Sequence, residues 1–241
     1  MPEDRRRVEC PFCFASAELF LPFGLDEPVL RRYRVVGGGR RPNAMCPTQE
    51  CWSLDRERLV YLFLKHQTNV LASAARVLHV APERGLAQSL RGRAGYVAGD
   101  LVPWSGVEAM DITNIQYPDG AFDVVICNHV LEHVVDDHRA MREIRRVLHH
   151  SGFAILQVPI ATALKTTLEA PDIVDPRNRA RTFGQCDHVR LYGADYAVRL
   201  ADAGFAVEVA NARETLGDAM CEQYALCKEE NLHLARPAAA N

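Results

Sequence analysis

The sequence contains no apolar run that approaches the roughly 20 residues of a membrane span. Its first ten residues, MPEDRRRVEC, also lack the apolar segment of a secretion signal. We therefore expect a cytoplasmic protein with no membrane partner. In that compartment the eight cysteines are expected as reduced thiols or metal ligands and not as disulfides.

A strong charge of one sign is missing as well. The 28 Lys and Arg residues against 31 Asp and Glu residues leave a formal net charge of -3, which argues against attraction of the whole molecule to nucleic acid. Arginine is nevertheless dense near the N-terminus. This density fits either a solvated surface or a local groove for phosphates or carboxylates. The arginines of this region are Arg5, Arg6, Arg7, Arg31, Arg32, Arg34, Arg40 and Arg41.

Residues 1–52 show little hydrophobic periodicity, so this segment cannot bury much apolar surface. It therefore needs an additional link, such as a bound metal ion, to fold. It carries two close cysteine pairs, with the sequences CPFC and CPTQEC. Such pairs suit tetrahedral zinc, because each turn presents two thiolates. Unrelated reduced cysteines are the alternative. We predict a zinc-ribbon-like module over residues 1–52, with a structural zinc ion bound by Cys10, Cys13, Cys46 and Cys51.

Residues 53–69 are predicted as a connecting helix with Ser53 as its N-cap and with Leu59, Leu62, Phe63 and His66 on one face. Over residues 70–230, short β-rich runs alternate with helical stretches. This alternation predicts an α/β fold with a doubly wound, mostly parallel seven-stranded sheet and helices on both faces. Residues 231–241 are predicted as a tail. The expected strands are 76–80, 96–98, 108–111, 121–127, 153–158, 205–209 and 222–227.

Two amphipathic helices are predicted in the second half of the chain. One covers Asp137–Leu148, is capped by Asp136 or Asp137, and is ended by Ser151 and Gly152. The other covers Tyr192–Ala203 and is ended by Gly204.

Polar residues follow four consecutive predicted strands: Glu83, Asp100, Asp111 and Asn128 with His129. In an open α/β sheet, ligands bind beyond the carboxyl ends of the strands. Four polar positions on one edge favour a small polar ligand. An adenosyl group would suit them, because one carboxylate can accept from both ribose hydroxyls and another from the adenine amino group.

The run from Met110 to Ile160 resembles the central half of the class I S-adenosylmethionine-dependent methyltransferases, which have a Rossmann-like fold. The resemblance extends from about residue 70 to residue 228 and includes the stretch GADYAVRLADAGFAVEV. The residues that carry it are Asp111, Pro118, Asp119, Gly120, Phe122, Asp123, Leu131, His133, Arg146, Val147, Leu148 and Gly152.

The first strand departs from the family pattern, which has an acidic residue and a Gly-x-Gly-x-Gly loop. His79 replaces the acid, Ala81 and Glu83 stand where glycines are expected, and only Gly85 remains. The chain is similar here to a set of bacterial methyltransferases with an LHxAPE-type turn after an N-terminal CPxC segment. We expect Glu83 to accept from the methionine ammonium group.

The resemblance implies S-adenosylmethionine as the cofactor, with Asp100 at the ribose, Asp111 and Ile112 at the adenine, and Asn128 and His129 beside the methionine portion. Asp123 is expected to start its strand in a structural role. The full set of expected cofactor contacts is His79, Ala81, Pro82, Glu83, Asp100, Leu101, Asp111, Ile112, Asn128 and His129.

The polar segment from Phe183 to Tyr192 lies where the family places loops that bind the methyl acceptor. A capped helix entry with an internal Asp–Arg pair is the other interpretation of this segment. Glu132 and His133 fit either a role near the site or a helix entry. The catalytic candidates are His188, His133 and Asp187, and the acceptor-binding candidates are Gln185, Arg190 and Tyr192.

The sequence therefore predicts a methyltransferase that acts on an oxygen or nitrogen atom of a small molecule, such as a secondary metabolite or a sugar derivative. One alternative is an RNA methyltransferase that uses the zinc module to dock RNA. The other is a non-catalytic zinc-ribbon interaction protein. The zinc module is also a candidate for one wall of the acceptor pocket.

Overall fold

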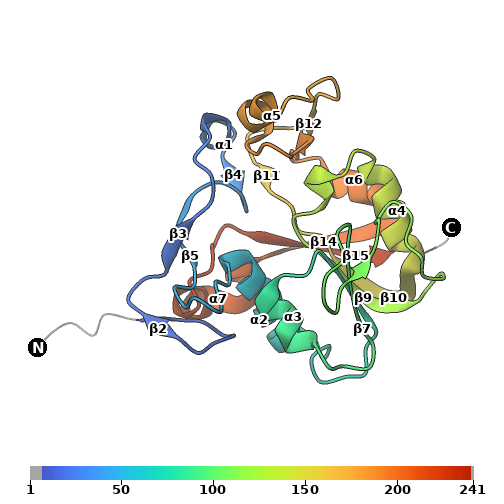
Figure 1. Cartoon of the computed structure of the whole chain (residues 1–241), viewed down its shortest axis with the longest axis horizontal. Helices are drawn as coiled ribbons and strands as arrows, with labels where there is room; N and C mark the ends of the chain where they lie inside the picture. The colour runs from blue at the N-terminus through green and yellow to red at the C-terminus, as the bar shows by residue number, and fades with distance from the viewer. Residues whose placement is uncertain (1–6, 240–241) are drawn as a thin grey trace, which may run out of the picture.

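The computed structural model describes residues 7–239. Its centre is a seven-stranded sheet in the order β14-β15-β10-β9-β6-β7-β8 (Figure 1). β15 runs antiparallel to both of its neighbours, and the other pairings within this sheet are parallel. The predicted doubly wound, mostly parallel α/β fold is confirmed. The strands are β6 (Val77–Val80), β7 (Tyr96–Asp100), β8 (Glu108–Ala109), β9 (Phe122–Cys127), β10 (Leu148–Ile155), β14 (Phe205–Asn211) and β15 (Asn231–Pro237).

Helices cover both faces of this sheet (Figure 1). On one face, α4 (Asp137–Val147) and α6 (Tyr196–Asp202) bury one hydrophobic core. On the other, α2 (Asp55–Gln67), α3 (Arg84–Leu90) and α7 (Ala212–Gln223) bury a second. The central strands are apolar without alternation because both of their faces are covered.

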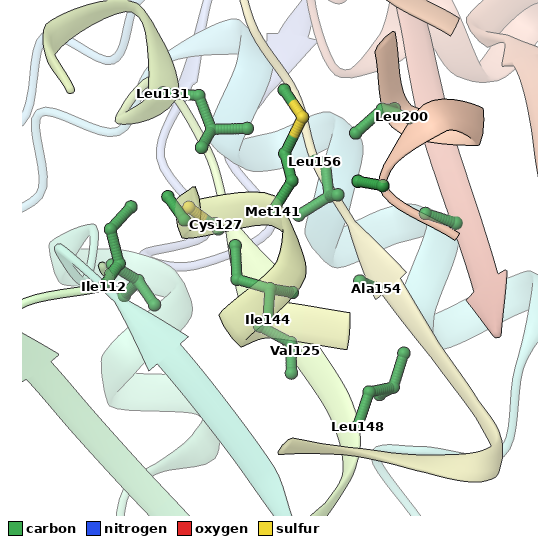
Figure 2. Close-up of a cluster of buried hydrophobic side chains, with 14 of the residues drawn as sticks. Ile112, Val125, Cys127, Leu131, Met141, Ile144, Leu148, Ala154, Leu156 and Leu200 are labelled. Carbon is green, nitrogen blue, oxygen red and sulfur yellow. The ribbon is translucent and has the colours of Figure 1, made fainter. Parts of the chain in front are cut away.

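The first core shows why α4 forms where it does. Met141 and Ile144 fall on one face of the helix and lie against Val125 of β9 and Ala154 of β10 (Figure 2). Full burial of such a side chain contributes roughly 1.5–3 kcal/mol. Asp136 caps this helix as expected, since its side chain accepts from the Arg139 backbone N–H at 2.9 Å.

The predicted end of α4 was wrong. The helix ends at Val147, and Leu148 already begins β10, so Ser151 and Gly152 lie inside that strand. Gly152 lets β10 and β9 approach closely, because a Cβ atom at this position would lie 2.4 Å from the Asp123 carbonyl oxygen.

The start of α2 also differs from the prediction. Leu54, and not Ser53, is the N-cap, and its backbone N–H donates to Glu57 Oε2 at 3.3 Å. Ser53 is buried, and its hydroxyl lies 3.2 Å from Cys10 Sγ. His66 is exposed, whereas Val60 and Leu64 complete the buried face with Leu59, Leu62 and Phe63.

The C-terminal elements required two further corrections. The strand expected at 222–227 is the end of α7 and a turn, and the missing strand is β15, inside the stretch expected as a tail. β15 lies between β10 and β14 with Leu232 and Leu234 buried. The helix expected from Tyr192 begins only at Tyr196, because Arg190–Leu191 forms β13, which pairs with β12 (Leu168–Glu169).

The N-terminal segment is built from short antiparallel pairs. β1 (Val8–Glu9) pairs with β2 (Ser16–Ala17), and β3 (Leu21–Phe23) pairs with β5 (Arg41–Met45). β4 (Val35–Val36) pairs with β11 (Ile160–Ala161), which follows β10. α1 (Pro28–Arg32) lies beside α5 (Pro176–Phe183) (Figure 1). The segment is thereby joined to the chain that leaves the sheet after β10.

Arg58 connects this segment to the second core. Its fully buried guanidinium donates to the carbonyl oxygens of Ser53 at 2.7 Å and of Tyr224 and Ala225 at 2.9 Å. It also lies 4.8 Å from the centre of the Phe20 ring. Burial lowers the pKa of this guanidinium, and the nearby carboxylates of Asp55 and Glu57 oppose that shift.

The Arg58→Met variant is expected to lower the free energy of unfolding by about 3 kcal/mol, because buried carbonyl groups lose their donors. Urea denaturation followed by circular dichroism measures this change. Arg142→Met, at an exposed position of α4, is the matched control and should change stability by less than about 0.5 kcal/mol. Equal stability of the two variants would contradict a linking role for Arg58.

Within residues 7–239, none of the helices has the length and apolar character that crossing a bilayer requires.

Candidate functional site

The carboxyl ends of β6, β7 and β9 meet at one edge of the sheet, and two of the turns there have unusual backbone geometry. Ala81 has a φ of 46° and His129 a φ of 54°, both in the left-handed region. The Ala81 N–H donates to the Gly99 carbonyl at 2.8 Å, and the His129 N–H donates to the Gln157 carbonyl at 2.7 Å. Ala81 thus takes the conformation that favours glycine, the residue expected there. Backbone strain of this kind clusters at functional sites.

Glu83 lies at the centre of a buried polar group behind these turns. Its Oε2 atom lies 2.7 Å from His79 Nε2, and its Oε1 atom accepts from Asn128 Nδ2 at 3.2 Å. His79 Nδ1 in turn lies 3.1 Å from the Tyr96 hydroxyl. Burial opposes ionisation of Glu83, but His79 outweighs it and holds the pKa of this carboxyl below its ordinary value. His79, fully buried, therefore positions Glu83 and is not itself placed at the edge.

The two carboxylates expected at the adenosyl group lie on the open edge. Asp100 Oδ1 accepts from the Val102 N–H at 3.3 Å, and Asp111 Oδ1 accepts from the N–H and the hydroxyl of Thr113, both at 2.8 Å. Among residues 7–239, none donates a hydrogen bond to the second oxygen of either carboxylate. Leu101 is 72% exposed, whereas Ile112 is buried in the first core.

A cavity of about 680 Å³ opens beside the ends of β9 and β10. The N-terminal segment from Pro22 to Arg41 forms one part of its lining, and the loop that follows α5 forms another. Asp187 and His188, both expected near the acceptor, are on that loop, together with Gln185, which donates to Asp187 Oδ1 at 2.8 Å. The charged and imidazole side chains that line the cavity are Arg40, Arg41, Arg56, His129, Glu132, His133, Asp187 and His188.

Three histidines and one glutamate form the floor of this cavity. The His133 and His188 rings lie 4.6 Å apart at 87°, and His133 Nδ1 is 3.3 Å from Asp187 Oδ2. His129 Nδ1 is 3.3 Å from Glu132 Oε1, without the geometry of a hydrogen bond. One ligand atom each of Glu132, His133 and His188 lie within 4.8 Å of one another. Glu132 and His133 therefore line the cavity together with His188, and a role for them in the reaction stays a prediction.

Burial governs the ionisation of this group. It raises the pKa of Glu132 to about 8, lowers that of His188 to about 4, and lowers those of His129 and His133. All four side chains therefore favour their neutral forms at neutral pH.

The sequence does not mark Arg56 as a site residue. The start of α2 carries it into the cavity, and its Nε atom is buried without a hydrogen-bond partner among the described residues. Its charge helps to lower the pKa of Glu83, which places the guanidinium near both the cavity and the buried polar group. No motif marked this arginine, because its role depends on contacts far away in the chain.

Two of the residues expected to bind the acceptor, Arg190 and Tyr192, are buried away from the cavity. The Tyr192 side chain is fully buried and its hydroxyl donates to Asp137 Oδ2 at 2.7 Å. Arg190 is also buried, with bonds to Glu169 at 2.7 Å and to the Leu131 carbonyl at 2.8 Å. Neither reaches the cavity, because internal partners already occupy their polar groups.

The four N-terminal cysteines are close together. Cys10 and Cys51 have their sulfur atoms 3.5 Å apart, those of Cys13 and Cys46 are 3.6 Å apart, and all four lie within 4.8 Å of one another. Tetrahedral zinc, with Zn–S bonds of about 2.3 Å, would place its sulfurs about 3.8 Å apart. All eight cysteines of the chain carry free thiols. The cluster is thus shaped to hold a metal ion.

Asp123, expected in a structural role, lies at the start of β9. Its carboxylate accepts from the backbone N–H of Arg76 at 2.9 Å and from the Arg76 guanidinium at 2.7 Å. These bonds tie the first residues of β9 to the start of β6, away from the cavity.

The comparisons with known proteins agree with this architecture. A family profile described as a methyltransferase domain matches residues 66–156. The crystal structure of the 4+2 cyclase SpnF aligns with a TM-score of 0.51 at 16% identity, over 90% of this chain and 100% of its own. That alignment supports the fold. A search of curated proteins found no significant match.

Two other solved structures have weaker likeness. The 1,6-didemethyltoxoflavin N1-methyltransferase of Burkholderia thailandensis, bound to its substrate and S-adenosylhomocysteine, aligns with a TM-score of 0.45 at 16% identity, covering 75% of this chain and 77% of its own. The complex of the Haloferax volcanii Trm112 methyltransferase activator with a methyltransferase aligns with a TM-score of 0.44 at 16% identity, covering 76% of this chain and 94% of its own.

Proposed function

Because this chain is a class I S-adenosylmethionine-dependent methyltransferase, we propose that it methylates an oxygen or nitrogen atom of a small molecule bound in the cavity. The observation that carries the proposal is the position of that cavity. It lies beside the carboxyl ends of β9 and β10, next to the edge where the cofactor of such enzymes is expected, and imidazoles line it.

The residues at the sheet edge fit S-adenosylmethionine. Asn128 Oδ1 is buried and has no partner among residues 7–239, and the Ala81 turn lets the backbone approach closely. We expect Glu83 to accept from the methionine ammonium group and Asp100 to accept from the ribose hydroxyls. Asp111 and Ile112 would contact the adenine. When bound, the cofactor supplies a methyl carbon that its sulfonium charge activates.

Arg56 completes this arrangement. A guanidinium with a buried, unpartnered Nε atom beside the cavity is suited to a carboxylate, because charge-assisted hydrogen bonds replace the solvation that burial removes. We expect it to bind the carboxylate of the methionine portion or an anionic group of the acceptor.

The cavity side chains would position the acceptor and handle its proton. Burial keeps His188 and His133 neutral, which is the form that accepts a proton from a hydroxyl. Asp187, 3.3 Å from His133, would orient that ring. Placing the acceptor atom in line with the methyl group supplies most of the rate enhancement, because the methyl carbon needs no further activation.

The Glu83→Gln variant tests the cofactor site. Loss of the negative charge beside the ammonium group is expected to weaken binding of S-adenosylhomocysteine by about 10- to 100-fold. Isothermal titration calorimetry measures this change. Glu214→Gln, at an exposed position of α7, is the control and should bind as the native protein does. Unchanged affinity of Glu83→Gln would remove Glu83 from the cofactor site.

A labelling experiment tests the choice of acceptor. The purified protein is incubated with methyl-labelled S-adenosylmethionine and a cell extract divided into small-molecule, RNA and protein fractions. We expect label in the small-molecule fraction. Label in ribonuclease-sensitive material would instead favour the RNA methyltransferase, and no label together with no cofactor binding would favour the non-catalytic interaction protein.

We further propose that Cys10, Cys13, Cys46 and Cys51 bind a structural zinc ion, and that residues 1–52 act as a module which it staples. The sulfur separations support this, and so does the lack of an open ligand position, which a catalytic zinc would require.

A further inference from the structure

The geometry points to a divalent cation site, separate from the cysteine cluster, formed by Glu132, His133 and His188 on the cavity floor with His129 beside them. Such a cation would hold an acceptor through two neighbouring oxygen atoms, one of which receives the methyl group. The inference rests on the proposed function, because it assigns the acceptor class of the same cavity.

The first observation is the convergence of the ligand atoms. A carboxylate oxygen of Glu132 and one ring nitrogen each of His133 and His188 lie within 4.8 Å of one another. Glu132 and His133 are adjacent in the short 3-10 helix Leu131–His133, whereas His188 comes from the loop after α5. Two segments far apart in sequence therefore direct metal-binding groups to one point, as a built site requires.

The second observation is that these groups lack protein partners. Glu132 Oε2, His188 Nδ1 and both ring nitrogens of His129 are buried without hydrogen bonds among the described residues. The Glu132 side chain is 2% exposed, that of His129 is 6% exposed, and the whole of His188 is 6% exposed. Unpaired buried polar atoms are costly, and a cation bound by Glu132 and His188, with one ring nitrogen of His129 beside it, would reduce that cost.

Asp187 supports the same assignment. Its Oδ2 atom lies 3.3 Å from His133 Nδ1, an ion-pair distance at which this carboxylate can help to orient the ring and leave Nε2 for the cation. Histidines that bind metals almost always have such a partner on their other nitrogen.

The donor set selects the kind of metal. One carboxylate and two or three imidazoles, with no thiolate, suit Mn²⁺, Fe²⁺, Co²⁺ or Zn²⁺ better than Mg²⁺ or Ca²⁺, which prefer oxygen ligands alone. Three or four protein ligands leave coordination positions that face the cavity. Two adjacent oxygens of one acceptor, such as those of a vicinal diol or a catechol, would fill them.

The cation would also activate the acceptor. A bound metal ion lowers the pKa of a coordinated oxygen by several units, as it does for water. The hydroxyl proton leaves to solvent, an O–C bond forms to the methyl carbon, and the C–S bond breaks with its electron pair remaining on sulfur. The products are the methyl ether, neutral S-adenosylhomocysteine and a proton. In this arrangement the cation takes over the activation of the hydroxyl that was assigned above to a neutral imidazole, and His133 and His188 act as its ligands.

Binding of Mn²⁺ tests the inference without knowledge of the acceptor. Mn²⁺ avoids thiolate sites, so it reports on the histidine cluster even while zinc occupies the cysteines. Electron paramagnetic resonance of MnCl₂ titrated into the full-length protein counts the bound ions. We expect one Mn²⁺ per chain, with binding weakened at least about 100-fold by Glu132→Gln and by His188→Gln. The exposed control His66→Gln should bind as the native protein does.

Titration of the same preparations with S-adenosylhomocysteine distinguishes failure of the proposed cation site from failure of the proposed methyltransferase function. Native protein and variants that bind this ligand equally are folded and have an intact cofactor site. Absence of Mn²⁺ binding to such native protein, or equal Mn²⁺ binding by Glu132→Gln and the native protein, would overturn the cation site and leave the methyltransferase proposal standing. Failure of the native protein to bind S-adenosylhomocysteine would contradict the proposed function itself.

Discussion

Replacement of Cys46 by serine is expected to release the zinc ion and unfold the N-terminal segment. Cys46 is fully buried in the cysteine cluster, and this polar segment has only a small hydrophobic cluster of its own around Val8 and Phe20. A structural zinc ion contributes apparent binding energy on the order of 10 kcal/mol, so its loss exceeds what such a cluster can offset. Hydrogen exchange over residues 7–52 and the zinc content of the purified protein measure the effect.

Cys186→Ser is the matched control, because Cys186 is exposed and lies outside the cluster. It should keep both the zinc and the protected amides. Loss of the N-terminal segment would also remove one wall of the cavity, so label transfer by Cys46→Ser should fall together with zinc content. A Cys46→Ser protein with native zinc content and native exchange would refute the structural zinc site.

The His188→Gln variant is expected to lower the rate of methyl transfer by at least about 100-fold, whether the imidazole acts as a base or as a metal ligand. His188 lines the cavity, whereas Asp100 and Asp111 do not. Its loss should therefore leave the affinity for S-adenosylhomocysteine unchanged. The measurement is the rate at which label enters the small-molecule fraction, with calorimetry on the same protein.

His66→Gln, on the exposed side of α2, is the control for this variant and should transfer label at the native rate. Native activity of His188→Gln would show that the side chain lines the cavity without taking part in the reaction. Loss of cofactor binding in the same variant would point instead to a structural role for His188.

Much of the fold could be predicted because its signals are local. The apolar runs that became β6 and β9, and the amphipathic pattern of α4, depend only on neighbouring residues. β15 was missed because its short apolar alternation follows a charged stretch and pairs with strands distant in sequence. Gly152 looked like a helix stop, although its role is a contact with the Asp123 carbonyl of the neighbouring strand.

In the site, too, features that depend on local sequence could be predicted, and features that depend on distant contacts could not. Polar residues after each strand could be identified because strand ends share an edge, and His133, Asp187 and His188 do meet at one cavity. Arg190 and Tyr192 have the same polar character in sequence, but their partners, Glu169 and Asp137, could be known only from the folded chain. Arg56 is the reverse case. In sequence it is an ordinary helix arginine, and only the packing of α2 brings it to the cavity.

Calorimetric titration of the native protein with S-adenosylhomocysteine shows whether the cofactor binds at the carboxyl ends of β6, β7 and β9. We expect saturable binding of one molecule per chain, and loss of most of that affinity when Asp100, at the end of β7, is replaced by alanine. Absence of binding by the native protein, or equal binding by the native protein and Asp100→Ala, would contradict the assignment of the cofactor site to this edge of the sheet.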